Sequence, residues 1–160
     1  MAKKITILFL CTGNSCRSQM AEAWTRSLKN DSIEPFSAGI TAHGLNPDAI
    51  TVMEEIGLDC SGWQSKTLDQ IAPEVTFDYV ITLCDNASQS CPYFSTTRTI
   101  VHKGFDDPPQ LARKTTCTTD RLAPYRRVRD EIKSFILSLP ENLPRRLPEN
   151  RNFFSDRGIF

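Results

Sequence analysis

The sequence lacks both a charge imbalance and a long apolar run. Its 160 residues carry 19 lysines and arginines against 19 aspartates and glutamates. Balanced charge provides no general field to attract nucleic acid or an anionic membrane, so we expect neither as a partner. No window approaches the roughly 18 uninterrupted apolar residues of a membrane-spanning helix. Any anion site in this chain must therefore be local.

We also expect no secretion signal. The amino-terminal stretch MAKKITILFLCTG contains an apolar run that is too short, and no small-residue cleavage site follows it. We therefore expect a cytoplasmic protein, and we expect it to be a monomer. The length favours one domain with a substantial core, which we place at residues 1–140, followed by a poorly ordered tail at 141–160.

The cysteines do not have the spacing of a structural zinc site. Four residues separate Cys11 from Cys16 and six separate Cys84 from Cys91, whereas zinc knuckles repeat a pair with about two to four intervening residues. Arg17, next to the first pair, would also repel a cation. We expect no metal and no bound cofactor. In a reducing compartment such cysteines are more often catalytic or redox-active.

Apolar runs and amphipathic stripes alternate along the chain. The predicted strands are 5–10, 36–39, 77–84 and 99–105. The predicted helices are 18–28, 47–57 and 125–139. This alternation predicts an α/β three-layer sandwich with a central, mostly parallel four-stranded sheet.

Polar residues follow three of the predicted strands. Cys11, Cys84 and the pair Asp106-Asp107 each lie at or just past a strand end. Ligands of parallel sheets bind outside the carboxyl ends of the strands. We therefore expect these three segments to converge on one rim of the sheet.

The segment CTGNSCRS, residues 11–18, joins the first strand to the first helix. A loop that enters a helix aims backbone N–H groups at one point, and the helix dipole adds positive charge there. Gly13 permits close approach, Asn14 tolerates a left-handed conformation and Arg17 can bind two oxygens at once. The same field favours a thiolate at Cys11. The predicted oxyanion-binding residues are Thr12, Gly13, Asn14, Ser15, Cys16 and Arg17.

The spacing Cys-x5-Arg-Ser is the signature of protein tyrosine phosphatases, and its position after the first strand resembles their low-molecular-weight branch. A hydrolase of this type needs Cys11, Arg17 and an acid. This chain has additional thiols at Cys84 and Cys91. A pair of thiols that becomes a disulfide delivers two electrons, which is the number that reduces a pentavalent oxyanion to a trivalent one.

Over about residues 4–139 the chain resembles thioredoxin-coupled arsenate reductases, which are built on the low-molecular-weight phosphatase fold. The matching segments are CTGNSCRSQMAEAW, SAGITAHGLNPDAI, VITLCDNASQSCP, HKGFDDPP and YRRVRDEI. The stretch QLARKTTCTTDRLAP and the tail do not match. The resemblance implies arsenate as substrate, thioredoxin as the external reductant, and arsenic detoxification as the role.

The resemblance also implies a relay of thiols. Cys11 attacks arsenate, Ser18 steadies its thiolate, and Asp107 protonates the departing oxygen. Cys84 then attacks Cys11, which releases arsenite and leaves a Cys11–Cys84 disulfide. Cys91 finally attacks Cys84 and moves the disulfide to Cys84–Cys91, where thioredoxin can reduce it.

Other functions remain open from the sequence. The main alternative is a low-molecular-weight protein tyrosine phosphatase with redox-regulatory cysteines, although such phosphatases usually carry an aromatic residue after the acid's Asp-Pro, where this chain reads DDPP. A noncatalytic thiol or metal-binding module is a third. Glutaredoxin with glutathione could replace thioredoxin as donor. For either enzyme we expect competition by phosphate or sulfate, and slow hydrolysis of aryl phosphates.

One position departs from the family pattern. Some members bind potassium through an asparagine, a glutamate, a serine and an aspartate. Asn14, Glu22 and Ser37 match the first three, but Lys66 stands at the fourth. Its ammonium group can pair with Glu22 in place of the ion, so we predict no potassium requirement.

The remaining candidate residues receive no catalytic role. Cys16 is interpreted as a partly buried spectator, and Cys60 and Cys117 as incidental. His43 and His102 are expected to make hydrogen bonds at loops or helix ends. Asp107 is preferred to Asp106 as the acid because a residue before proline is held extended, which fixes its direction.

Overall fold

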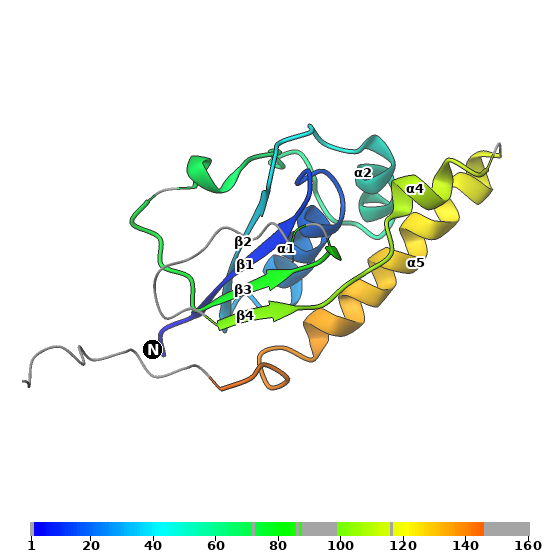
Figure 1. The fold of residues 1–160 in the computed structure, drawn as a ribbon. Helices are drawn as coiled ribbons and strands as arrows, with labels where there is room; N and C mark the ends of the chain where they lie inside the picture. The colour runs from blue at the N-terminus through cyan, green and yellow to red at the C-terminus, as the bar shows by residue number, and fades with distance from the viewer. Residues whose placement is uncertain (1, 72, 86, 88–98, 116, 146–160) are drawn as a thin grey trace, which may run out of the picture.

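The computed structural model describes residues 2–71, 73–85, 87, 99–115 and 117–145, with the backbone alone at 118 and 119. Its centre is a four-stranded sheet with the order β2-β1-β3-β4, in which every neighbouring pair is parallel. The strands are β1 (Ile5–Cys11), β2 (Ile33–Gly39), β3 (Tyr79–Thr82) and β4 (Thr99–His102). The predicted α/β class with a central four-stranded parallel sheet is confirmed (Figure 1).

The register of the sheet brings the ends of β1 and β3 together. Residues 7–10 of β1 are fully buried, as expected for an aliphatic strand covered on both faces. Leu10 pairs with Thr82, and the amide of Leu83 donates to the carbonyl of Leu10 at 2.9 Å. Cys11, which ends β1, and Cys84, two residues beyond β3, therefore leave the sheet at the same edge.

Among the described residues, four helices and one turn of 3-10 helix surround the sheet. They are α1 (Arg17–Leu28), α2 (Pro47–Glu54), α4 (Pro108–Ala112), α5 (Thr118–Leu137) and η1 (Leu68–Gln70). Helix α1 packs on β1, β2 and α5. The indole of Trp24 in α1 donates to the carbonyl of Arg129 in α5 at 3.0 Å. Asn46 caps α2 as expected, since its side chain accepts from the amides of Asp48 and Ala49.

Several predicted boundaries were wrong. Helix α5 begins at Thr118 rather than near residue 125, and Pro124 lies inside it. Leu122 and Tyr125 are both buried, so tertiary packing extends this helix through a segment without a regular apolar stripe. Strand β2 starts three residues earlier than predicted, at Ile33, while β3 and β4 end earlier than predicted. The short elements η1 and α4 were not predicted.

The first residues beyond the predicted domain boundary contact the sheet. The hydroxyl of Tyr79 donates to the carbonyl of Pro144 at 2.8 Å, and Leu143 packs against the core. Residues 146–160 lie outside the described part of the chain. The division into a domain at 1–140 and a poorly ordered tail at 141–160 stays a prediction.

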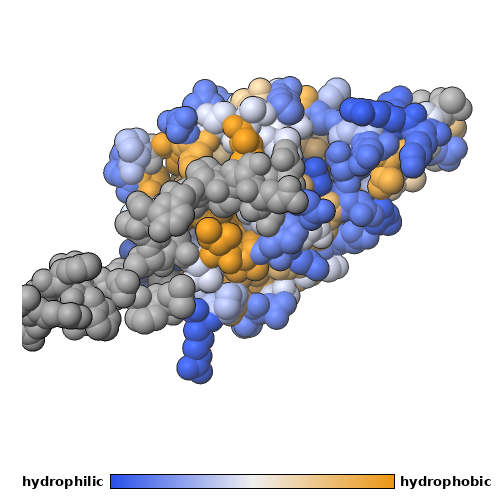
Figure 2. Space-filling model, in the orientation of Figure 1, coloured by the Kyte–Doolittle hydropathy of each residue, from blue (hydrophilic) through white to orange (hydrophobic). Residues whose placement is uncertain are grey.

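Charged pairs cover the outer side of the last helices. Figure 2 shows hydrophilic side chains over the end of the molecule that α4 and α5 form. Arg121 pairs with Asp48 at 3.1 Å and Arg126 with Glu55 at 2.6 Å, which links α5 to both ends of α2. No helix among the described residues is both long enough and apolar enough to cross a membrane.

Candidate active site

The carbonyl groups of the loop between β1 and α1 bind a neighbouring segment of the chain. Four of these carbonyls accept hydrogen bonds of 3.0–3.1 Å from amides of segment 40–46; the donor–acceptor pairs are Ile40–Cys11, Thr41–Thr12, His43–Gly13 and Asn46–Ser15. No described residue accepts a hydrogen bond from the amides of residues 13–16. These amides remain for a ligand at the start of α1, where the helix dipole also favours an anion.

Asn14 holds the loop from inside. It has a φ of 48° and is fully buried, so the left-handed conformation expected for it is present. Its Oδ1 accepts from the side chain of Gln19 at 3.0 Å and from the amide of Lys66 at 2.9 Å. Its Nδ2 donates to the Oγ of Ser18 at 2.8 Å. One side chain thus ties the loop to α1 and to the segment that contains Lys66.

Ser18 is directed at the thiol of Cys11. The two side-chain atoms are 2.8 Å apart, and Cys11 is 4% exposed. The amide nitrogen of Asn14 can only donate, so the hydroxyl oxygen of Ser18 accepts there and its proton is free for the sulfur. A hydroxyl that donates to sulfur stabilises the thiolate, which is the nucleophilic form.

Two aspartates follow β4, and the structure separates them. Arg17 donates to the carbonyl of Phe105 at 3.0 Å, and its Nη2 lies 3.6 Å from Asp107 Oδ1. Asp106 instead pairs with Arg127 of α5 at 2.9 Å. Asp107 is therefore the aspartate that faces the loop of residues 11–18 between β1 and α1, which we call the anion loop. A cleft of about 410 Å³ opens here, lined by Arg17, Cys84, Asp85, Gly104, Phe105, Asp106, Asp107 and Gln110.

Cys84 lies at the edge of the anion loop. Its Sγ is 3.2 Å from Thr12 Oγ1 and accepts from the amide of Ala87 at 3.4 Å. Thr12 directly follows Cys11, so the hydroxyl of the loop and the second thiol are in contact although 72 residues separate them. The described cysteines are all free thiols. Cys91, the third thiol of the predicted relay, lies outside the described residues.

Two other thiols are poor nucleophiles in this structure. Burial, assisted by the nearby charge of Cys11, raises the pKa of Cys16 far above its usual range. Burial also raises the pKa of Cys60 to about 11. Both remain protonated near neutral pH, whereas attack requires the thiolate. Cys117 is exposed at the start of α5. Among the described residues, the hydrogen-bond partners of Cys84 Sγ are Thr12 and Ala87 and include none of these three thiols.

A cluster of charges surrounds Glu22 behind the loop. Lys66 Nζ lies 3.8 Å from Glu22 Oε2, so the predicted ion pair is present. Ser37 donates to the same oxygen, and Arg26 binds the other one at 2.9 Å. The negative charge of Glu22 is thus balanced by cationic groups of this chain itself.

Sequence reasoning missed two contributors to this site. Segment 40–46 contributes through its backbone amides. Almost every residue type has such an amide, so the sequence does not reveal this role. Gln19 is 3% exposed and donates to the backbone and side chain of Asn14 and to the carbonyl of Gln64. Nothing in its residue type or position distinguishes Gln19 from an ordinary helix residue.

Comparisons with known proteins agree with this architecture. The sequence profile of the family described as low molecular weight phosphotyrosine protein phosphatase matches residues 6–148. The arsenate reductase of Halalkalibacterium halodurans is 47% identical over 141 residues, covering 88% of this chain and 98% of that protein. The arsenate reductase of Bacillus subtilis is 46% identical over 132 residues, covering 82% and 91%.

Solved structures give the same result. A structure described as an arsenate reductase in the phosphate binding state has a TM-score of 0.69 and 30% identity, covering 84% of this chain and 95% of that one. A tyrosine phosphatase of Erwinia amylovora has a TM-score of 0.66 at 18% identity, covering 90% and 96%, which supports the fold alone. The chain is therefore a member of the low molecular weight phosphotyrosine protein phosphatase family.

Proposed function

We propose that this protein reduces arsenate to arsenite through the thiols of Cys11, Cys84 and Cys91, with thioredoxin as the final reductant. The observation that carries the proposal is the contact of Cys84 with Thr12, which places a second thiol beside the anion loop. A phosphatase has no use for this thiol. The relatives with the names quoted above are arsenate reductases, which favours the same substrate.

The first step forms a bond between sulfur and arsenic. Arsenate binds to the amides of residues 13–16 and to the guanidinium of Arg17. The thiolate of Cys11, steadied by Ser18, attacks arsenic, and one arsenic–oxygen bond breaks. Asp107 gives its proton to the departing oxygen, which leaves as water. Arsenic is still pentavalent in this adduct.

The second step transfers two electrons. The thiolate of Cys84 attacks the sulfur of Cys11, and the electron pair of the sulfur–arsenic bond passes to arsenic. Arsenite leaves as the trivalent product, and the two sulfurs become a disulfide. Cys91 then attacks Cys84, so that Cys11 departs as a thiolate and is ready again. Thioredoxin supplies the electrons that reduce the Cys84–Cys91 disulfide.

The second candidate function is hydrolysis of phosphate esters. The same loop and the same acid support it, and phosphate is bound by the relative of 30% identity described above. Pro109 follows Asp107-Pro108, so no aromatic ring stands at that position to contact a phenyl group. We therefore expect slow hydrolysis of small aryl phosphates as a side activity.

Changing Asp107→Asn should lower kcat for phenyl phosphate by about 10²–10³-fold, because the leaving oxygen then departs without a proton. The loss should be much smaller for 4-nitrophenyl phosphate, whose leaving group needs less protonation. Asp106→Asn is the matched control and should stay within about threefold, since Asp106 pairs with Arg127. Equal losses for both substrates, or a larger loss in the control, would contradict the assignment of Asp107.

Turnover should be the same in potassium and sodium salts at equal ionic strength, because Lys66 already pairs with Glu22. Lys66→Ala should lower the free energy of unfolding by about 1 kcal/mol, since it removes a partner from a half-buried carboxylate. Urea unfolding of this variant and of Lys3→Ala, an exposed control, measures the difference. Stimulation of the unchanged protein by potassium over sodium would count against this account.

A further inference from the structure

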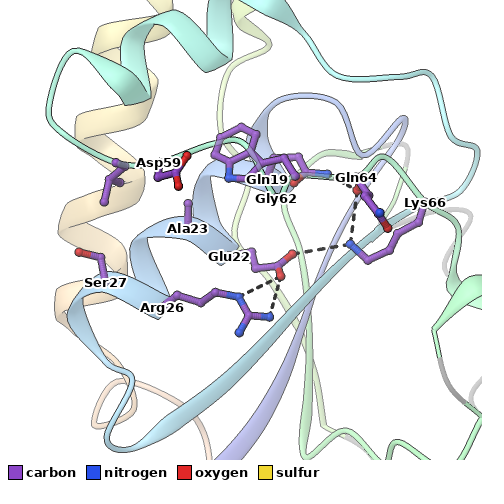
Figure 3. Close-up of a pocket in the computed structure, with 11 residues that line it drawn as sticks. Gln19, Glu22, Ala23, Arg26, Ser27, Asp59, Gly62, Gln64 and Lys66 are labelled. Carbon is purple, nitrogen blue, oxygen red and sulfur yellow. Dashed lines mark hydrogen bonds and ion pairs between the residues drawn. The ribbon is translucent and has the colours of Figure 1, made fainter.

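A second cavity lies between α1 and the segment 58–66. Its volume is about 630 Å³, within the range of sites for small organic molecules. It shares no lining residue with the cleft at Arg17. The lining residues are Gln19, Glu22, Ala23, Arg26, Ser27, Leu58, Asp59, Gly62, Trp63, Gln64 and Lys66 (Figure 3). Neither the relay nor the anion loop uses this space.

Gln19 presents a hydrogen-bond acceptor to the cavity. The Nε2 of Gln19 donates to the backbone and side-chain oxygens of Asn14 and to the carbonyl of Gln64. Its Oε1 receives no hydrogen bond from any residue in the described ranges, although Gln19 is only 3% exposed. The oxygen is not among the buried side-chain atoms that lack a partner, so it is accessible from the cavity and can accept from a ligand that offers an N–H group.

The two carboxylates that line the cavity differ in their partners. Glu22 is paired with Lys66 and Arg26, as the dashed lines in Figure 3 mark. Asp59 has no cationic partner within the part of the chain that the structure describes. Its carboxylate accepts from the amide of Ser61 at 2.9 Å, and this hydrogen bond holds the pKa of Asp59 below its usual range. The carboxylate is therefore ionised at neutral pH and available to a cation.

Another part of the lining is apolar or aromatic. Trp63, Leu58 and Ala23 line the same cavity as Asp59, and an indole face attracts planar rings and cations. We propose that this cavity binds a small planar cation, of the amidinium or protonated amino-heterocycle class. Its N–H groups pair with Gln19 Oε1 and the Asp59 carboxylate, and its ring lies against Trp63.

The occupied cavity would act on the anion loop through Gln19. This side chain binds Asn14, Asn14 binds Ser18, and Ser18 binds the thiol of Cys11. A ligand that binds the free oxygen of Gln19 holds the same amide group whose Nε2 donates to Asn14, and so acts on Asn14 through this side chain. Coupling of this kind is reciprocal, so we expect the cation to change the affinity of the loop for anions.

Benzamidine is a suitable probe, because it combines a flat ring with an amidinium group. In ¹H–¹⁵N NMR spectra its addition should shift the indole resonance of Trp63 and leave that of Trp24 in place. Trp24 is an internal control, since it does not line the cavity and donates to Arg129. Benzoate, with the same ring and the opposite charge, should bind at least about tenfold more weakly.

Two variants test the named contacts. Asp59→Asn should weaken benzamidine binding at least about fivefold, while Asp69→Asn, an exposed carboxylate outside the cavity, should not. Ala23→Leu fills the cavity with a residue that favours helices and should abolish the Trp63 shift. An unshifted Trp63 resonance, or the same affinity in Asp59→Asn and Ala23→Leu as in the unchanged protein, would overturn the site.

The coupling is measured with inorganic phosphate rather than with arsenate. The Kd of phosphate by calorimetry should change at least about threefold when benzamidine saturates the cavity, and not in Ala23→Leu. An unchanged Kd would overturn the proposed coupling. Because phosphate binding involves no electron transfer, this result is independent of whether the thiol relay operates.

Discussion

The variant Cys84→Ser is expected to lose arsenite formation by at least about a thousandfold while it keeps aryl phosphate hydrolysis within about twofold. The hydroxyl of serine cannot form a disulfide with Cys11, so the adduct with arsenic has no route to the trivalent product. Hydrolysis needs Cys11, Arg17 and Asp107; water then attacks phosphorus and releases the Cys11 thiolate, so no second thiol takes part. Both rates are measured on the same protein sample, with an arsenite assay and with 4-nitrophenyl phosphate.

Cys117→Ser is the matched control for that experiment. Cys117 is exposed at the start of α5 and has no role in the proposed relay, so both activities should remain. Equal losses of reduction and hydrolysis in Cys84→Ser would indicate a damaged anion loop instead of a missing electron donor. Preserved reduction in this variant would remove Cys84 from the relay.

The variant Cys91→Ser should release about one arsenite per protein and then stop, even with thioredoxin present in excess. The first two steps need only Cys11 and Cys84, which the structure places at the same edge of the sheet. The resulting disulfide is enclosed, since Cys11 and Cys84 are only 4% and 6% exposed. A protein reductant needs in-line access to a sulfur, and Cys91 is proposed to provide it.

A small reductant distinguishes the cause of the arrest. Dithiothreitol reaches enclosed disulfides more easily than a protein does, so it should restore slow turnover of Cys91→Ser. Steady turnover of this variant with thioredoxin at the rate of the unchanged protein would exclude Cys91 from the relay. Full activity with glutaredoxin and glutathione, and none with thioredoxin, would identify glutathione as the source of electrons. The proposed steps among the three cysteines would stay the same.

The sequence was most informative where function depends on side chains that are close in the chain. The loop 11–18 could be predicted because its glycine, asparagine, arginine and serine follow a buried strand at fixed offsets. The convergence of Cys84 and Asp107 on this loop was also predictable, because the ends of parallel strands meet at one edge. Neither inference required the identity of distant packing partners.

The missed features depend on contacts between distant segments. The amides of segment 40–46 orient the carbonyls of the loop, and any residue except proline could supply them. The early start of α5 follows from the burial of Leu122 and Tyr125, which no local pattern reveals. Gln19 reads as an ordinary helix residue until the structure shows what its amide binds.

The proposed relay depends most directly on a bond forming between Cys11 and Cys84. Cys91→Ser protein, treated with arsenate without reductant, can be digested under acid conditions and its disulfides mapped by mass spectrometry. We predict one disulfide, between Cys11 and Cys84, formed in proportion to the arsenite released. Arsenite release with Cys84 still a free thiol, or with Cys11 joined to Cys16 instead, would contradict the account.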